Sequence, residues 1–214
     1  MENPFILSPY AEKLLFCDRE TELNSLMELV TNGVNVTLIS PRRMGKTGLI
    51  YRFFDEIFIK KFEIETFYVD IYATQTIDDF IKIFSENIIQ SFQKKTSMLK
   101  KAMKVFSGVK PVLSFDELTG NLQLSLTYNN NDEKMQTLRS IFDFLENYGK
   151  RVIVAFDEFQ QIREYAGINM EAVLRTYIQP LKNVNFIFKN VMKDFCGWKR
   201  TFFKTKDENI CTTP

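Results

Sequence analysis

The chain has 214 residues, a net charge of +1, 45% hydrophobic residues and no histidine. This composition is ordinary for a globular protein, argues against a nucleic-acid or membrane footprint over the whole chain, and excludes an imidazole base or ligand. The three cysteines, Cys17, Cys196 and Cys211, form no C-x-x-C pair, which predicts a reducing, cytoplasmic location without disulfides or a zinc site. No apolar run approaches the length of a membrane span.

The first half of the chain predicts a strand between two helices. An N-terminal lead and helix occupy residues 1–32, with Leu23, Leu26, Met27 and Val30 on one apolar helical face. The β-rich run 34–39 follows, and residues 47–57 then carry an apolar helical pattern.

Strands and helices continue to alternate in the rest of the chain. We expect strands at 66–72, 151–156 and 185–188, helices at 77–92, 138–145 and 170–178, and a last β-like stretch at 210–212. Segments 112–115 and 122–128 predict a small hairpin, inserted within residues 105–130. The pattern predicts a single α/β domain over residues 1–214, with a mainly parallel sheet between helices and a ligand site at the carboxyl ends of the strands.

A phosphate-binding loop is the most informative motif. Residues 40–47 match G-x-x-x-x-G-K-[ST] except at the first position, and the expected nucleotide-binding residues are Ser40, Pro41, Arg42, Arg43, Met44, Gly45, Lys46, Thr47 and Gly48. A strand, a tight loop and a helix N-terminus direct backbone N–H groups at one point, where the helix dipole favours an anion. Lys46 would contact the β- and γ-phosphates, and Thr47 would ligate Mg²⁺. The alternative is a strand-to-helix turn that contains Gly-Lys-Thr.

A second acidic motif ends the buried strand 151–156. In nucleotide-hydrolysing P-loop proteins, an acidic residue at such a strand end holds Mg²⁺, and Asp157 fits that role. Glu158 is placed to deprotonate the attacking water as a general base. The alternative is that both acids serve as turn residues or helix caps.

These motifs, with Arg19-Glu20-x-Glu22-Leu23 and Phe156-Asp157-Glu158-Phe159-Gln160, resemble the archaeal-type P-loop ATPase family of AAA-like signal-transducing NTPases. The resemblance implies a three-layer core with strand order 5-1-4-3-2, ATP and Mg²⁺ as ligands, and residues 16–23, Arg19 among them, beside the adenine. Relatives carry a small Gly-Ser-type sensor segment after the strand equivalent to 185–188, whereas this chain continues with Lys189. Relatives also continue into a C-terminal helical or winged-helix domain, so we expect a truncation after the nucleotide-binding core.

Two positively charged features have open interpretations. Arg175 is either a catalytic arginine finger or a member of a helix-surface ion pair. The lysines between residues 94 and 104 either contact nucleic acid or form a solvated helical face.

Three functions compete. The chain is a Mg-dependent ATPase that works as a switch for a protein partner or for self-association, a module or relic that only binds ATP, or a P-loop kinase. Glu158 beside Asp157 favours water as the nucleophile, which ranks the kinase last.

Overall fold

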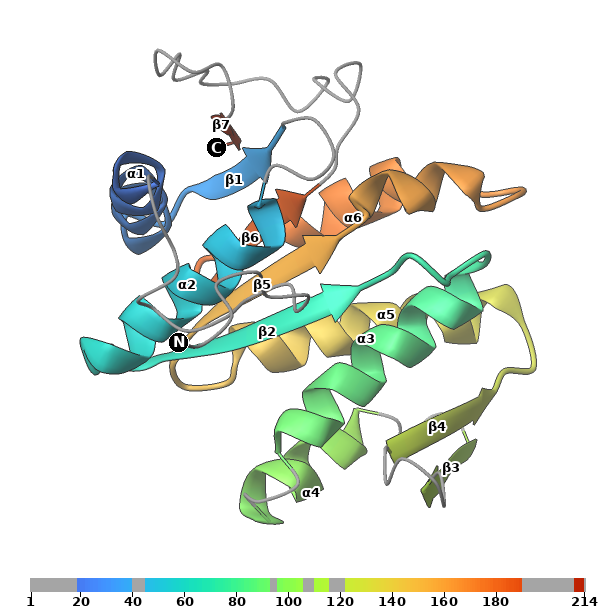
Figure 1. Ribbon diagram of the computed structural model, residues 1–214. Coiled ribbons are helices and arrows are strands. Elements are labelled where there is room, and N and C mark those ends of the chain that lie inside the picture. Colours follow the sequence, from blue (N-terminus) through green and yellow to red (C-terminus); the bar gives the residue numbers. More distant parts are fainter. Residues whose placement is uncertain are drawn as a thin grey trace, which may run out of the picture.

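The computed structural model describes residues 19–39, 45–92, 96–105, 110–115, 122–189 and 210–213. Within these ranges a five-stranded sheet lies between two layers of helices, and a two-stranded hairpin lies beside one layer (Figure 1). The elements in chain order are α1 (Glu20–Thr31), β1 (Asn35–Leu38), α2 (Lys46–Ile59), β2 (Ile64–Asp70), α3 (Ile77–Ser91), α4 (Thr96–Lys104), β3 (Lys110–Phe115), β4 (Leu122–Thr127), α5 (Asn131–Glu146), β5 (Arg151–Asp157), the 3₁₀-helix η2 (Phe159–Glu164), α6 (Met170–Ile178), β6 (Val184–Lys189) and β7 (Ile210–Thr213). The expected α/β fold with a mainly parallel sheet is confirmed.

The large sheet has the order β2-β5-β6-β1-β7. The first four strands are parallel to their neighbours, and β7 pairs antiparallel with β1. In this register Leu38 of β1 lies opposite Lys189 of β6, and Asp70 of β2 lies opposite Asp157 of β5. The carboxyl ends of the four parallel strands therefore meet at one edge, where a ligand site is expected in such sheets.

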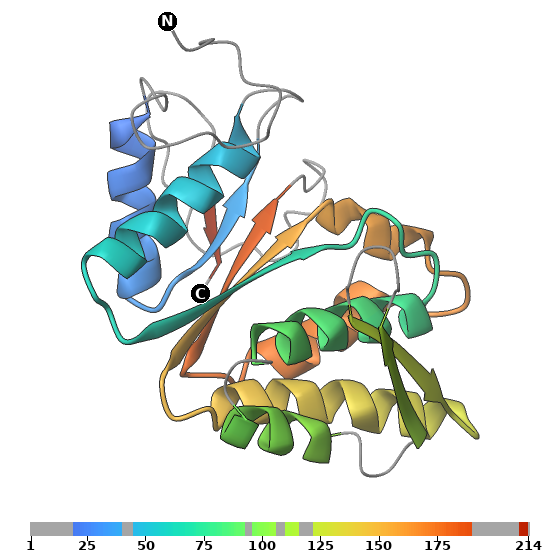
Figure 2. The ribbon, with the colours of Figure 1, turned by 60° about the horizontal axis from the view of Figure 1, so that its bottom comes forward.

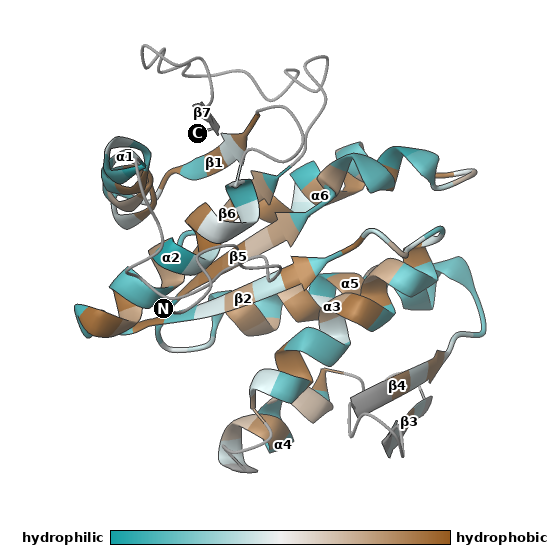
Figure 3. Ribbon diagram, viewed as in Figure 1, coloured by the Kyte–Doolittle hydropathy of each residue, from teal (hydrophilic) through white to brown (hydrophobic). Residues whose placement is uncertain are grey.

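Alternating side chains of β5 divide the interior into two cores. Val152, Val154 and Phe156 belong to the core under α3, α5 and α6. Ile153 and Ala155 belong to the second core, under α1 and α2. Because successive strand residues point to opposite faces, an almost uninterrupted apolar run satisfies both layers. Figure 2 shows the helices on either side of the sheet, and Figure 3 shows the apolar colouring of β5 and β6.

The helices begin in two different ways. Thr76, Asn130 and Asn169 precede α3, α5 and α6, and each accepts a hydrogen bond from a first-turn backbone N–H group. These caps satisfy N–H groups that a helix start otherwise leaves unpaired. Helix α2 instead follows Gly45, which has no side chain to cap it.

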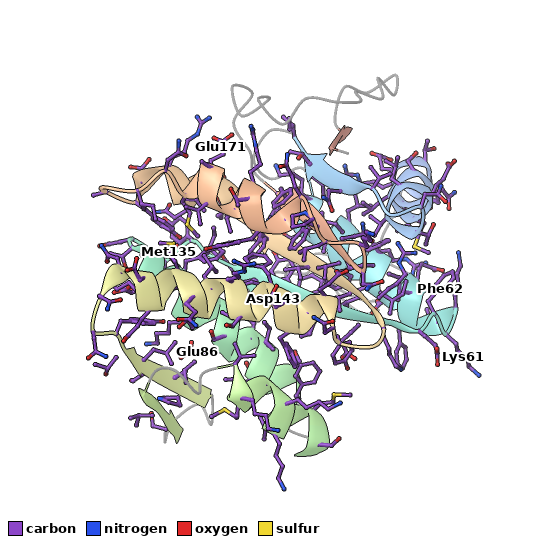
Figure 4. The ribbon with its side chains drawn as sticks, turned by 180° about the vertical axis from the view of Figure 1, so that it is seen from behind. Lys61, Phe62, Glu86, Met135, Asp143 and Glu171 are labelled. Carbon is purple, nitrogen blue, oxygen red and sulfur yellow. The ribbon has the colours of Figure 1, made fainter. Side chains whose placement is uncertain are left out.

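The expected hairpin is present as β3 paired antiparallel with β4. Leu124 of β4 is fully buried, and its backbone N–H donates to Glu86 Oε1 of α3 at 2.6 Å. Figure 4 labels Glu86 on the side of α3 that faces the hairpin. Among the described residues of the hairpin, Leu124 is buried in the larger core, Leu126 packs against it, and the Leu124 N–H bonds to α3.

Candidate functional site

The structure describes the end of the expected phosphate loop. Ser40, Pro41, Arg42, Arg43 and Met44 lie outside the described residues, so their contacts with phosphate stay predictions. Gly45 has a φ of 66°, in the left-handed region that glycine adopts without a steric penalty. A Cβ added to Gly45 would lie 3.5 Å from Arg19 Nη1, which is an ordinary contact. The backbone conformation, rather than a lack of room, favours glycine here.

Lys46 and Gly48 lie in the first turn of α2, and both are buried. Burial lowers the pKa of Lys46, and the nearby positive charge of Lys189 lowers it further, while Glu158 and Asp157 oppose the shift. The ammonium of Lys46 therefore lies beside a second cation at the positive end of a helix. A bound anion would stabilise both cations.

Arg19 lies at the same end of the sheet, although it comes from another element. It precedes α1, and its Nε atom is 3.1 Å from Glu22 Oε1. Its guanidinium reaches the surroundings of Gly45 and contributes a positive charge near Lys46. The fold thus brings Arg19 close to the end of the phosphate loop, and its position beside the adenine stays a prediction.

Asp157 is the centre of a buried hydrogen-bond cluster at the end of β5. Its Oδ2 atom accepts from the hydroxyl of Tyr68 and from Lys189 Nζ, the latter at 2.5 Å. Its Oδ1 atom accepts from the backbone N–H of Glu158 at 2.7 Å. Because Asp157 is only 5% exposed, these donors replace the water that a carboxylate otherwise needs.

Lys189 is a site residue that the sequence analysis missed. It is 6% exposed, and its Nζ atom lies 2.5 Å from Thr47 Oγ1 and 2.5 Å from Asp157 Oδ2. The ammonium therefore lies between the two residues expected to ligate Mg²⁺. A signal was available, because Lys189 ends a strand whose neighbours end in the phosphate loop and in the acidic pair.

Glu158 has an unusual backbone conformation. Its φ of 53° places a residue with a side chain in the left-handed region. Such residues cost about 1–3 kcal/mol each and often lie in functional sites. Its Oε2 atom accepts from Gln160 Nε2 at 2.5 Å. The conformation points the chain sharply from β5 into η2, directly beside Asp157.

Arg175 lies on α6, where its Nη2 atom is 3.7 Å from Glu171 Oε1, one helical turn away. Figure 4 labels Glu171 on the outer side of α6. This is the helix-surface ion pair that the sequence analysis gave as an alternative. The role of arginine finger stays a prediction.

The donors fit Mg²⁺ by type but not by arrangement. Thr47 and Asp157 supply the hydroxyl and the carboxylate that the metal takes in P-loop sites. Both are bound to Lys189, so a positive charge already lies between them. Within the described ranges, no group of three or more Cys, Asp or Glu side chains offers another metal site. The residues therefore do not fit Mg²⁺ unless Lys189 moves away.

In the described part of the chain, no helix combines the length and apolar character needed to cross a membrane.

Comparisons with known proteins place the fold. The Walker-type ATPase of Pyrococcus abyssi is 24% identical, with a TM-score of 0.54, and the match covers 87% of this chain and 49% of that one. The ORC2 protein of Aeropyrum pernix, solved as ADPNP–ADP complexes, is 12% identical, with a TM-score of 0.45 and coverage of 84% and 43%. This chain thus spans about half the length of these proteins.

A third structure and a family model complete the comparison. Cdc6p from Pyrobaculum aerophilum is 13% identical, with a TM-score of 0.44 and coverage of 84% of this chain and 42% of that one. No curated protein matches the chain. A family model described as an ATPase domain predominantly from Archaea matches residues 16–192, and these contain Arg19, the phosphate loop, the acidic pair and Lys189. The chain therefore belongs to this family of ATPase domains.

Proposed function

We propose that this chain binds ATP through its phosphate loop and works as a nucleotide-dependent switch. The observation that carries the proposal is the position of Lys46, buried in the first turn of α2 beside Lys189 and within electrostatic reach of Arg19. Arg19 is already paired with Glu22, whereas Lys46 and Lys189 lie together at the start of α2. Two lysines beside a helix start without a side-chain cap favour a polyphosphate.

The switch role rests on the links between elements. Lys189 joins the end of β6 to the start of α2 and the end of β5 through Thr47 and Asp157. A nucleotide that binds Lys46 would bring its phosphate charge to the Lys189 ammonium and so alter the strength of these links. We propose that a protein partner or a second copy of the chain reads this change. A cytoplasmic location is proposed on the cysteine pattern alone.

Hydrolysis of ATP is the second candidate, and Glu158 supports it. This carboxylate follows Asp157 directly, on a backbone held in the left-handed region, and it accepts from Gln160. A carboxylate beside the phosphates can take a proton from an attacking water molecule, so Glu158 would be the general base. Hydrolysis that depends on Mg²⁺ would first require Lys189 to leave Thr47 and Asp157.

One experiment on four proteins separates these functions. Binding of ATP is measured by calorimetry and release of phosphate in a single turnover, for the wild type, Lys46→Ala, Glu158→Gln and the control Lys182→Met. Lys182 is exposed and lies outside the site. Loss of the Lys46 charge should weaken binding by about tenfold or more. Glu158→Gln should retain binding and should lose any turnover that the wild type shows.

Each outcome has a distinct meaning. Equal binding by the wild type and Lys46→Ala would contradict the proposed function. Phosphate release that survives Glu158→Gln would contradict hydrolysis with Glu158 as the base. Transfer of phosphate only to an added acceptor would indicate a kinase.

A further inference from the structure

The Lys189 ammonium lies where the sequence motifs place a magnesium ion. It touches a hydroxyl and a carboxylate, Thr47 Oγ1 and Asp157 Oδ2, each at 2.5 Å. These are the oxygens that the family motif assigns to Mg²⁺. The cation is therefore part of the chain and cannot diffuse away.

The fold holds Lys189 in this position firmly. It is the last residue of β6, and its backbone lies in register with Leu38 of β1, directly before the phosphate loop. Its side chain is 6% exposed, and the Asp157 carboxylate that it neutralises is 5% exposed. Removing one partner of a buried ion pair leaves the other charge without compensation, so displacement of Lys189 is unfavourable.

The chemistry of an ammonium allows it to contact phosphate at the same time. A lysine ammonium has three N–H donors on a flexible side chain, whereas Mg²⁺ requires near-octahedral oxygen ligands. Among the described residues, Lys189 donates to Thr47 and to Asp157, which leaves a third N–H group for a phosphate oxygen. Lys46, at the start of α2, lies close enough to Lys189 for their charges to interact, so one triphosphate can contact both lysines.

We infer that this site binds ATP in its metal-free form, with the Lys189 ammonium in place of Mg²⁺. The inference rests on the proposed ATP binding and narrows it to one ionic form of the ligand. Magnesium weakens binding in this scheme, because it converts free ATP into a complex whose metal competes with Lys189 for Thr47 and Asp157.

The test compares ATP affinity by calorimetry in EDTA and in excess Mg²⁺. The wild type should bind ATP in EDTA and should bind about tenfold more weakly in Mg²⁺. Lys189→Met removes the charge and keeps the length of the side chain. This variant should lose binding in EDTA by about tenfold or more and should bind better with Mg²⁺ than without it. The control Lys182→Met should behave like the wild type in both buffers.

A result with the wild type can overturn the inference whether or not Lys189→Met folds. Binding by the wild type that requires Mg²⁺ would overturn it and would leave the proposed function intact. Absence of ATP binding in both buffers would overturn the proposed function itself. A folded Lys189→Met protein that binds metal-free ATP as well as the wild type would show that Lys189 does not act as the cation.

Discussion

Tyr68 shares Asp157 with Lys189. Its hydroxyl donates to Asp157 Oδ2, and its ring stacks on Tyr51 with centroids 4.8 Å apart. Burial raises the pKa of Tyr68, and the hydrogen bond to the Asp157 carboxylate raises it further. Tyr68 therefore stays a hydrogen-bond donor to Asp157 at any physiological pH.

Removal of this hydroxyl should destabilise the protein. Tyr68→Phe keeps the ring and its stacking on Tyr51 but leaves Asp157 with one donor fewer. Since hydrogen bonds to charged groups contribute about 1.5–3 kcal/mol, we expect a loss of that size in the free energy of unfolding, measured with urea. Tyr72→Phe, at a side chain that is 68% exposed, should cost almost nothing. A similar loss in both variants would show that the contact with Asp157 is not stabilising.

The sequence predicted part of this site and missed part of it, for a physical reason. Local motifs with a characteristic spacing predicted four of its residues, Lys46, Thr47, Asp157 and Glu158. Lys189 and the hydroxyl contact of Tyr68 have no local signature. They reach Asp157 only through the lateral pairing of β2, β5 and β6, which joins residues far apart in the chain.

Among the elements, the hairpin β3–β4 depends most on a neighbour. An isolated two-stranded sheet is marginally stable at best in water. In its described part, Leu124 is buried in the larger core, Leu126 packs against that core, and the Leu124 N–H donates to Glu86 of α3. Local opening of the hairpin should therefore respond to a change on α3.

Glu86→Ala should increase amide exchange in the hairpin without unfolding the rest of the chain. The variant removes the acceptor of the Leu124 N–H group, so that group should exchange faster, as should its neighbours in β4. Hydrogen exchange measured by mass spectrometry resolves this segment from β5 and β6, which should not change. Glu28→Ala on the exposed side of α1 is the matched control. Unchanged exchange in β4 would show that apolar packing, as of Leu124 and Leu126, anchors the hairpin without this hydrogen bond.

Periodicity predicted most elements because most of them are amphipathic or fully buried. The long helix α3 and the apolar strand β5 are the clearest cases. Helix α4 has nine residues, several of them lysines, and was visible only as a charged cluster. The 3₁₀-helix η2 is too short to show a period. A β-like run also carries no information on strand direction, so the antiparallel pairing of β7 required the structure.

For the whole molecule, aromatic side chains hold the larger core together. Phe156 of β5 lies at the centre, with ring centroids 5.5 Å from Phe80, 5.1 Å from Phe84 and 5.9 Å from Phe159. Rings at these separations attract one another beyond the effect of area burial. Since Asp157 and Glu158 follow Phe156 directly, this packing also fixes the acidic end of the site.

The same interior contains tyrosines whose ionisation links stability to pH. Burial raises the pKa of Tyr165 to about 12, against 10.0 for an ordinary tyrosine. Burial also raises the pKa of Tyr68, Tyr128 and Tyr148. The unfolded chain therefore loses its tyrosine protons at a lower pH than the folded protein. The contribution of these tyrosines to the free energy of unfolding is complete below pH 10 and decreases above it.

Tyr165→Phe isolates one of these groups. The Tyr165 hydroxyl lies 2.6 Å from Thr74 Oγ1, so the variant should lose some stability at neutral pH. Between pH 10 and about pH 12, however, its free energy of unfolding should fall less steeply than that of the wild type. The reason is that the unfolded variant has one tyrosine proton fewer to release. Urea unfolding at several alkaline pH values measures both slopes, and the exposed Tyr72→Phe should keep the wild-type slope. Equal slopes for Tyr165→Phe and the wild type would mean that burial of Tyr165 does not oppose its ionisation.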